Sequence, residues 1–175
     1  MPPPPFDRHQ ARAIIEHLGL EPLPVEGGLF RQTWRSDSGG RVVGTAILLA
    51  LTDDPDSFSA LHRLTIDEIW HFHLGDPVRM LLLHPDGTWG QPVLGPDVLG
   101  GHHPQLVVPA GTWMGARVDD GGAFALLGTT MAPGFHPGCF EGAPARDLAE
   151  RWPAAADRIR SLVRPGSPRH LPDGP

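Results

Sequence analysis

The chain lacks several features that would place it in a specialised class of protein. It has a single cysteine, Cys139, which excludes an intrachain disulfide framework. No apolar run approaches the roughly 20 residues that span a bilayer. No cluster of basic residues offsets the formal net charge of −6. These absences argue against a membrane protein and against a nucleic-acid or anionic-membrane partner.

The beginning of the sequence also lacks a secretion signal. Its first ten residues, MPPPPFDRHQ, contain neither a positively charged region nor an apolar core. We therefore expect a soluble, cytoplasmic protein whose partner is a small molecule.

Charged residues make up only 19% of the 175, whereas Gly (22) and Pro (21) are abundant and separate short apolar runs. This pattern is typical of an all-β protein with many tight turns.

The order of these runs predicts one barrel domain with helices at both ends. Asp7 is a suitable N-cap and Gly19 a suitable stop for a first helix, and Pro153 interrupts a second helical stretch or divides it in two. Between them lie roughly nine or ten short strands, as in a sandwich or barrel. The expected segments are a disordered Pro-rich start (1–6), a barrel with its N-terminal helix (7–144), a helical segment (145–164) and a loose tail (165–175).

The most informative segment is Leu61–Pro77, LHRLTIDEIWHFHLGDP. It is predicted to form two antiparallel strands joined by a short turn. Because side chains alternate between the faces of a strand, an inward Glu68 places Trp70 and Phe72 inward beside it. His62 on the preceding strand then faces Glu68 across a pocket, while His71 and His73 share the other face unless a bulge shifts the parity. An acid and an imidazole in an apolar pocket suggest perturbed protonation and hence function.

Two further stretches offer residues that bind substrate. In VEGGLFRQTWRS the alternation predicts a strand, and Arg31 with Thr33 presents polar groups to an anionic or hydroxylated ligand. In HHPQLVVPAGTWMGARV, Gln105 and Trp113 are candidates for the pocket wall or its mouth. Each of these four residues also has a purely structural interpretation, in which it lies on a solvated strand face, in the core or at a sheet edge.

These motifs together resemble a cupin subfamily, the cupin-5-like proteins or domain of unknown function 985. The stretches that carry the resemblance are PVEGGLFRQTWRS, TAILLAL, SALHRLTIDEIWHFHLGDP, the LG before the His102 loop, PQLVVPAGTW and LLGTTMAPGF, which together span roughly Ala11 to Glu141. The resemblance implies a double-stranded β-helix (jelly-roll) barrel. It also implies a homodimer and an open-ended pocket like those of sugar epimerases, isomerases and germin-like proteins.

The first cupin motif is matched only in part. His62, Glu68 and Gly75 keep its register, but Leu64 stands where the family usually carries a second histidine. In the second motif Met114 replaces another histidine, and a thioether is a poor ligand for iron, manganese or zinc. The chain also contains no tyrosine, so the tyrosine general acid of sugar epimerases is missing.

Three functions follow as alternatives. The first is an epimerase- or isomerase-like enzyme acting on a sugar-like or carboxylated metabolite, in which His62 and Glu68 are the acid–base pair. In it Arg31 holds an anionic group, and Trp70, Phe72 and Trp113 form apolar walls. The second is a metal-dependent oxygenase or decarboxylase with a divalent ion on His62, Glu68 and a third ligand, which is His71, His73 or a residue outside the motif. The third is a barrel that binds a metabolite without catalysis.

Overall fold

The computed structural model describes residues 6–172. The Pro-rich start therefore lies outside the described residues except for its last position, as do residues 173–175 of the tail. The first helix, α1 (Arg8–Leu18), begins and ends where the sequence predicts. The Asp7 carboxylate accepts a hydrogen bond from the backbone N–H of Gln10, and Gly19 adopts the left-handed conformation with φ 62°.

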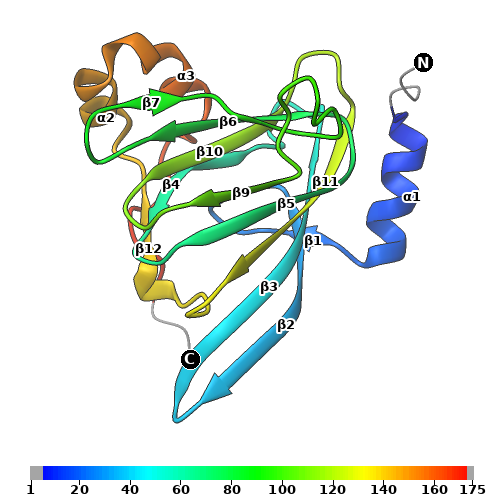
Figure 1. Cartoon of the computed structure of the whole chain (residues 1–175), viewed down its shortest axis with the longest axis horizontal. Coiled ribbons are helices and arrows are strands. Elements are labelled where there is room, and N and C mark those ends of the chain that lie inside the picture. The colour runs from blue at the N-terminus through cyan, green and yellow to red at the C-terminus, as the bar shows by residue number, and fades with distance from the viewer. Residues whose placement is uncertain (1–5, 173–175) are drawn as a thin grey trace.

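Two antiparallel sheets face each other and make up most of the molecule (Figure 1). The strands of the first sheet, in spatial order, are β1 (Glu21–Pro22), β2 (Leu29–Ser38), β3 (Arg41–Thr52), β11 (Phe124–Met131), β5 (Glu68–Gly75) and β9 (Gln105–Val108). Those of the second are β12 (Phe140–Gly142), β4 (Ser59–Leu64), β10 (Trp113–Val118), β6 (Val78–Leu83) and β7 (Trp89–Gly90), with β8 (Val93–Leu94) also paired to β6. This is the all-β jelly-roll expected from the sequence.

The predicted β4–β5 hairpin is wrong in its pairing. β4 pairs with β10 and β12, whereas β5 pairs with β11 and β9 in the other sheet. The turn at residues 65–67 thus carries the chain from one sheet to the other. Alternation specifies which face each side chain occupies but not which strand lies alongside, so the sequence pattern fitted both arrangements.

The main core fills the space between the sheets. Leu51, Trp70, Met80, Met114 and Leu127 belong to it and are almost fully buried. The packing role predicted for Met114 is confirmed, because its thioether lies inside this cluster. Burying one such apolar side chain stabilises the folded state by about 1.5–3 kcal/mol relative to leaving it in water.

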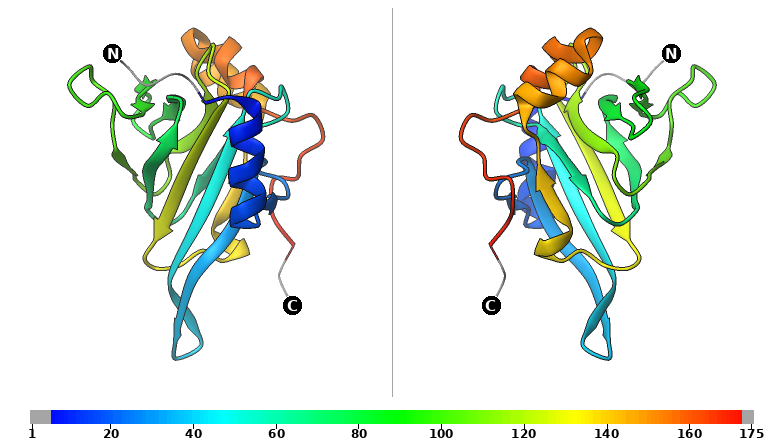
Figure 2. Two further views of the ribbon diagram at one scale, coloured as in Figure 1. Left: turned by 90° about the vertical axis from the view of Figure 1, so that its right-hand side faces the viewer. Right: turned by 90° about the vertical axis from the view of Figure 1, so that its left-hand side faces the viewer.

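Helices cover the outer face of each sheet (Figure 2). α1 packs on the first sheet over Ala50, Phe124 and Leu126, so β3 is covered on both faces in its second half. The second sheet is covered by α2 (Ala145–Arg151), η2 (Pro153–Ala155) and α3 (Ala156–Ser161). The helical segment is therefore divided at Pro153, as predicted. The β2–β3 hairpin projects beyond the rest of the fold in both figures.

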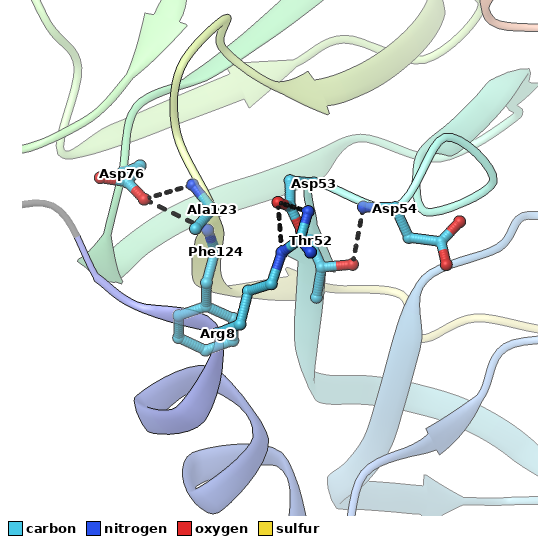
Figure 3. A network of polar contacts seen from close by, with 7 residues as sticks. All are labelled: Arg8, Thr52, Asp53, Asp54, Asp76, Ala123 and Phe124. Carbon is cyan, nitrogen blue, oxygen red and sulfur yellow. Dashed lines mark hydrogen bonds and ion pairs between the residues drawn. The ribbon is translucent and has the colours of Figure 1, made fainter.

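A polar network joins α1 and the end of β5 to the loops at one end of the barrel (Figure 3). Arg8 Nε donates to Asp53 Oδ2 at 2.9 Å, next to the end of β3. The buried Asp76 carboxylate accepts from the backbone N–H groups of Ala123 and Phe124 at 2.7 and 3.2 Å. Gly75, with φ 104°, precedes it where a Cβ would lie 2.3 Å from the Phe124 carbonyl oxygen, so the glycine of the motif is a structural requirement.

Candidate functional site

His62 and Glu68 point into the interior from opposite sheets. His62 on β4 is 2% exposed and Glu68 at the start of β5 is 7% exposed. Their charges interact, since the Glu68 carboxylate raises the pKa of His62 and protonated His62 lowers that of Glu68. The convergence of these two residues was predicted, although it is reached across the sandwich instead of along a hairpin.

Glu26 is a third polar residue of the site, and it was not among the residues predicted. It lies in the turn between β1 and β2, and its Oε2 is 3.8 Å from Nε2 of His62. The backbone there is unusual, because Val25 has φ 68° and Gly27 φ 87°. Positive φ at a β-branched residue is rare and clusters at functional sites. The acidic residue before the double glycine in VEGGLF was the available signal, but the prediction from this stretch concerned only Arg31 and Thr33.

The imidazole of His62 is held in one orientation. Its Nδ1 is 2.7 Å from the carbonyl oxygen of Ala60, which only accepts hydrogen bonds. Nδ1 therefore carries the proton, and Nε2 of the neutral ring presents a lone pair toward Glu26. The ring also stacks on Phe140 at 5.4 Å and 20°. Burial lowers the pKa of His62, outweighing the opposing effects of Glu68 and Ala60, so the ring is kept neutral.

The two carboxyl groups titrate near neutral pH, so the pair is partly protonated there. Burial raises the pKa of Glu26 to about 7. Burial likewise raises the pKa of Glu68 to about 7, assisted by repulsion from Glu26 and opposed by hydrogen bonds from Thr129 and Trp70. The Trp70 indole N–H donates to Glu68 Oε2 at 2.9 Å. The two groups interact and so titrate as a pair that holds protons well above the range of an ordinary glutamate.

Both carboxyls line a cavity of about 90 Å³ between the inner face of the first sheet and β4. The other lining residues are Leu23, Phe30, Gln32, Thr45, Ile47, Leu64, Thr129, Met131 and Phe135. Gln32 is exposed and so marks the mouth. The Thr45 hydroxyl accepts the backbone N–H of Phe135 at 3.0 Å, which fixes the loop that follows β11 over the cavity. Apolar walls with a few convergent polar groups are typical of a small-molecule site.

Most of the predicted substrate-binding residues lie elsewhere. Arg31 and Thr33 are exposed on the outer face of β2, because Phe30 and Gln32 occupy its inner face. The Thr33 hydroxyl donates to the carbonyl oxygen of Ala46 at 3.3 Å. The predicted alternation of β2 holds at these positions, and it places Arg31 and Thr33 on the face away from the cavity.

Gln105 and Trp113 are also outside the cavity. Gln105 Nε2 lies 3.1 Å from His71 Nδ1 on the outer face of the first sheet. Trp113 faces outward from β10 into the cluster beneath the C-terminal helices, with the Arg63 guanidinium 4.7 Å above its ring. Trp70 and Phe72 face inward as predicted, but they pack in the core, and Trp70 reaches the site only through Glu68.

Of the three residues predicted to hold a metal, His71 does not join His62 and Glu68. His71 bonds to Thr130 Oγ1 at 2.8 Å on the outer face and stacks on His73 at 6.4 Å. A register shift in the β5–β11 pairing falls at His73, yet that residue stays exposed. Leu64 and Met114 fill the inward positions where the motif would place histidines. Within residues 6–172 no three His, Cys, Asp or Glu side chains are grouped so that they hold a metal ion, and the donor set does not fit one.

The two facing antiparallel sheets and the cavity between them define a jelly-roll barrel with a hollow interior. The family model described as Cupin superfamily (DUF985) matches residues 12–143. The chain therefore belongs to this cupin family, and the resemblance seen in its motifs is confirmed. No curated protein matches the chain.

Solved structures agree with this assignment. A protein from Shewanella oneidensis is 32% identical over 89% of this chain and 98% of its own, with a TM-score of 0.80. A hypothetical protein from Leishmania major is 28% identical over 87% and 98% of the two chains, with a TM-score of 0.75. A cupin 2 conserved barrel domain protein from Rhodopseudomonas palustris, 14% identical over 79% and 81% with a TM-score of 0.53, shares the fold alone.

Proposed function

We propose that the protein is an enzyme that transfers protons on a small polar metabolite, in the manner of an epimerase or isomerase. The observation that carries this proposal is the pair Glu26 and Glu68, two carboxyl groups on one cavity with pKa values of about 7. A general acid or base works best when its pKa lies near the working pH. Structural carboxylates rarely satisfy that condition, because they are usually stabilised as anions.

At neutral pH the pair supplies one carboxylate and one carboxylic acid. The carboxylate accepts a proton from a carbon next to a carbonyl group, and the carboxylic acid donates its proton to the carbonyl oxygen. Return of a proton to a carbon and loss of one from the oxygen completes an isomerisation or epimerisation. The enzyme ends with the protons with which it began, so no external oxidant or co-reactant is required.

His62 positions Glu26 in this scheme. Its Nδ1–H is engaged by Ala60, so only the Nε2 lone pair faces Glu26, at 3.8 Å. The lone pair of a neutral imidazole disfavours a carboxylate opposite it and favours the protonated form, so Glu26 is the acid of the pair. Glu68, whose anion accepts the Trp70 indole N–H, is the base. This assignment moves the acid–base work from the expected pair His62 and Glu68 to Glu26 and Glu68, because Glu26 lines the cavity and His62 lies behind it.

The proposal is tested by hydrogen exchange on carbon. Wild-type protein in D2O is incubated with a panel of small hydroxy-carbonyl and amino-carbonyl compounds, and deuterium incorporation is followed by mass spectrometry. We expect one exchanged C–H in a panel member, lowered at least 100-fold in Glu68→Gln and in Glu26→Gln. The matched control is Glu16→Gln on the exposed face of α1. Absence of exchange across the panel, or exchange at an unchanged rate in both cavity variants, contradicts the proposal.

A further inference from the structure

The cavity contains acidic groups and no basic group to balance them. Glu26 and Glu68 are its only titratable lining residues among the described positions. The chain has no lysine, and all 14 of its basic residues are arginines. The neighbouring imidazole of His62 is kept neutral by burial. Any net charge on the residues that line the cavity is therefore negative.

Two arginines on segments that adjoin the site, Arg164 and Arg63, are engaged elsewhere. Arg164 donates to the backbone carbonyl oxygens of Glu26, Asp56 and Phe58 at 2.9, 2.6 and 3.0 Å, and thus binds the turn without reaching into the cavity. Arg63 pairs with Glu141 on the outer side of β4. Neither guanidinium lines the cavity, so an anionic ligand there finds no cation.

The remaining wall is mainly apolar. Six of the lining residues have purely hydrophobic side chains: Leu23, Phe30, Ile47, Leu64, Met131 and Phe135. Two of these are aromatic, and aromatic rings attract organic cations as well as apolar groups. A ligand that fits this wall carries a hydrocarbon portion of a few carbons, given a cavity of about 90 Å³.

We propose that the cavity binds a small organic ammonium compound, with its ammonium group on Glu26 and Glu68 and its hydrocarbon portion against the apolar wall. If the ammonium compound is the substrate of the enzyme, this inference rests on the proposed function. The preference for binding an ammonium compound rests on the cavity alone. A carboxylate or phosphate of the same shape is repelled by the acidic pair in a site partly withdrawn from water. An uncharged alcohol gains only a hydrogen bond.

Binding of the ammonium group also moves a proton. The cation keeps its own protons, and the carboxyl pair releases to the buffer up to one proton that it held in the free protein. Affinity for the ammonium therefore rises between pH 6 and 8. The other titratable groups that act on the pair are His62 from β4, whose pKa is lowered by burial, and Cys139 from η1 (Pro137–Cys139), whose pKa is raised by burial.

The test compares three probes of one shape and different charge on the full-length protein. These are 3-methylbutylamine, 3-methylbutanol and 3-methylbutanoate, titrated calorimetrically at pH 7.5. We expect the amine to bind at least about 10-fold more tightly than the alcohol, and the carboxylate more weakly than either. The amine titration is repeated in buffers of different ionisation enthalpy, and the change in binding enthalpy with buffer should show that protons are released on binding.

Matched variants assign the preference to the cavity. Glu26→Gln and Glu68→Gln keep the shape of the side chain and should each weaken amine binding about 10-fold while leaving alcohol binding unchanged. Glu16→Gln on the surface should change neither, and thermal unfolding checks that every variant is folded. Equal affinity for the three probes, preference for the carboxylate, or no binding of the amine overturns the inference.

The two proposals fail separately. Amine binding that depends on Glu26 and Glu68 without any carbon-bound hydrogen exchange supports a cation-binding barrel and contradicts the enzyme. Exchange on an uncharged substrate without an amine preference supports the enzyme and contradicts the ammonium site.

Discussion

At the scale of single residues, the burial of two protonated carboxyl groups affects stability as well as chemistry. In the native protein the pKa values of Glu26 and Glu68 are about 7, raised from an ordinary value of 4.5. Between these values the native state binds more protons than the unfolded state. The stability contributed by these protons is therefore complete below about pH 4.5 and is lost as the pH rises through 7.

This predicts a pH-dependent difference between wild type and the double variant Glu26→Gln/Glu68→Gln. The variant should gain stability relative to wild type by at least about 2 kcal/mol from pH 5 to pH 8. His62 and His73, whose pKa values are lowered mainly by burial, titrate in both proteins and largely cancel. Urea unfolding at each pH measures the difference, with Glu16→Gln as control. A difference that stays constant with pH contradicts the prediction.

Arg164 is the residue that secures the acidic turn. It is the donor to three backbone carbonyl oxygens, including that of Glu26, and its guanidinium lies 3.8 Å from the centroid of the Phe58 ring. The Glu26 and Asp56 carbonyl oxygens also accept the backbone N–H groups of Ala60 and Phe58 at 2.7 and 3.2 Å, so among these acceptors Arg164→Ala leaves only the Phe58 carbonyl oxygen without its partner. The variant should lower the free energy of unfolding by about 1–3 kcal/mol through the lost hydrogen bonds and that one unpaired acceptor.

Arg160 provides the matched control for that substitution. Its only described polar contact is a 3.0 Å pair with Asp157 on the exposed side of α3, so Arg160→Ala should cost under about 0.5 kcal/mol. Arg164→Lys should recover little, because an ammonium does not span three acceptors as a planar guanidinium does. Equal losses of stability in Arg164→Ala and Arg160→Ala, measured by urea unfolding, would show that the turn does not depend on Arg164.

At the scale of elements, the C-terminal helices support the barrel from outside. Ile159 on α3 is fully buried in the cluster that also contains Trp113 and Trp152. Ile159→Ala should lower stability by about 2–4 kcal/mol through lost burial and the cavity left behind. Its control, Arg146→Ala on the exposed side of α2, should have little effect. A loss under 1 kcal/mol in Ile159→Ala would mean that these helices are dispensable for the barrel.

Much of this organisation was predictable because it depends on local chemistry. The caps of α1, the division at Pro153 and the alternation at the start of β5 follow from backbone preferences and side-chain periodicity. In β2 the alternation holds only up to Gln32, where the first of two register shifts begins. Strand pairing is a long-range property, and the sequence pattern did not show that β4 and β5 join different sheets. For the same reason the outward positions of Gln105 and Trp113 were not foreseen.

The site was predictable only where a motif marked it. His62 and Glu68 stand in a recognisable register, whereas Glu26 is separated from them by more than thirty residues and is brought close by the turn before β2. Its role becomes visible from the neighbouring strained Val25 and from the burial of its carboxyl group. Arg31 was predicted to bind a ligand because it is charged. The same charge explains why it lies on a solvent-exposed strand face.

At the scale of the whole molecule, self-association stays a prediction. β9 is the last strand of its sheet, and Val107 on it is 50% exposed, as is Trp34 (51%) on the projecting hairpin. Unpaired strand edges with exposed apolar side chains favour pairing with another chain. Light scattering on the 18.9 kDa chain should give about twice that mass. The mass of a single chain at every concentration would contradict a homodimer.

No helix among residues 6–172 is long and apolar enough to cross a membrane.

The central claim is that Glu26 and Glu68 hold protons at neutral pH because they share one buried cavity. The most direct measurement is a pH titration of the glutamate side-chain carboxyl ¹³C resonances of the full-length protein. The account predicts two glutamates with midpoints at about pH 7, one of which disappears in Glu26→Gln and the other in Glu68→Gln. If every glutamate instead titrates below about pH 5, as in solvent, the pair is an ordinary set of carboxylates and the proposed acid–base site is contradicted.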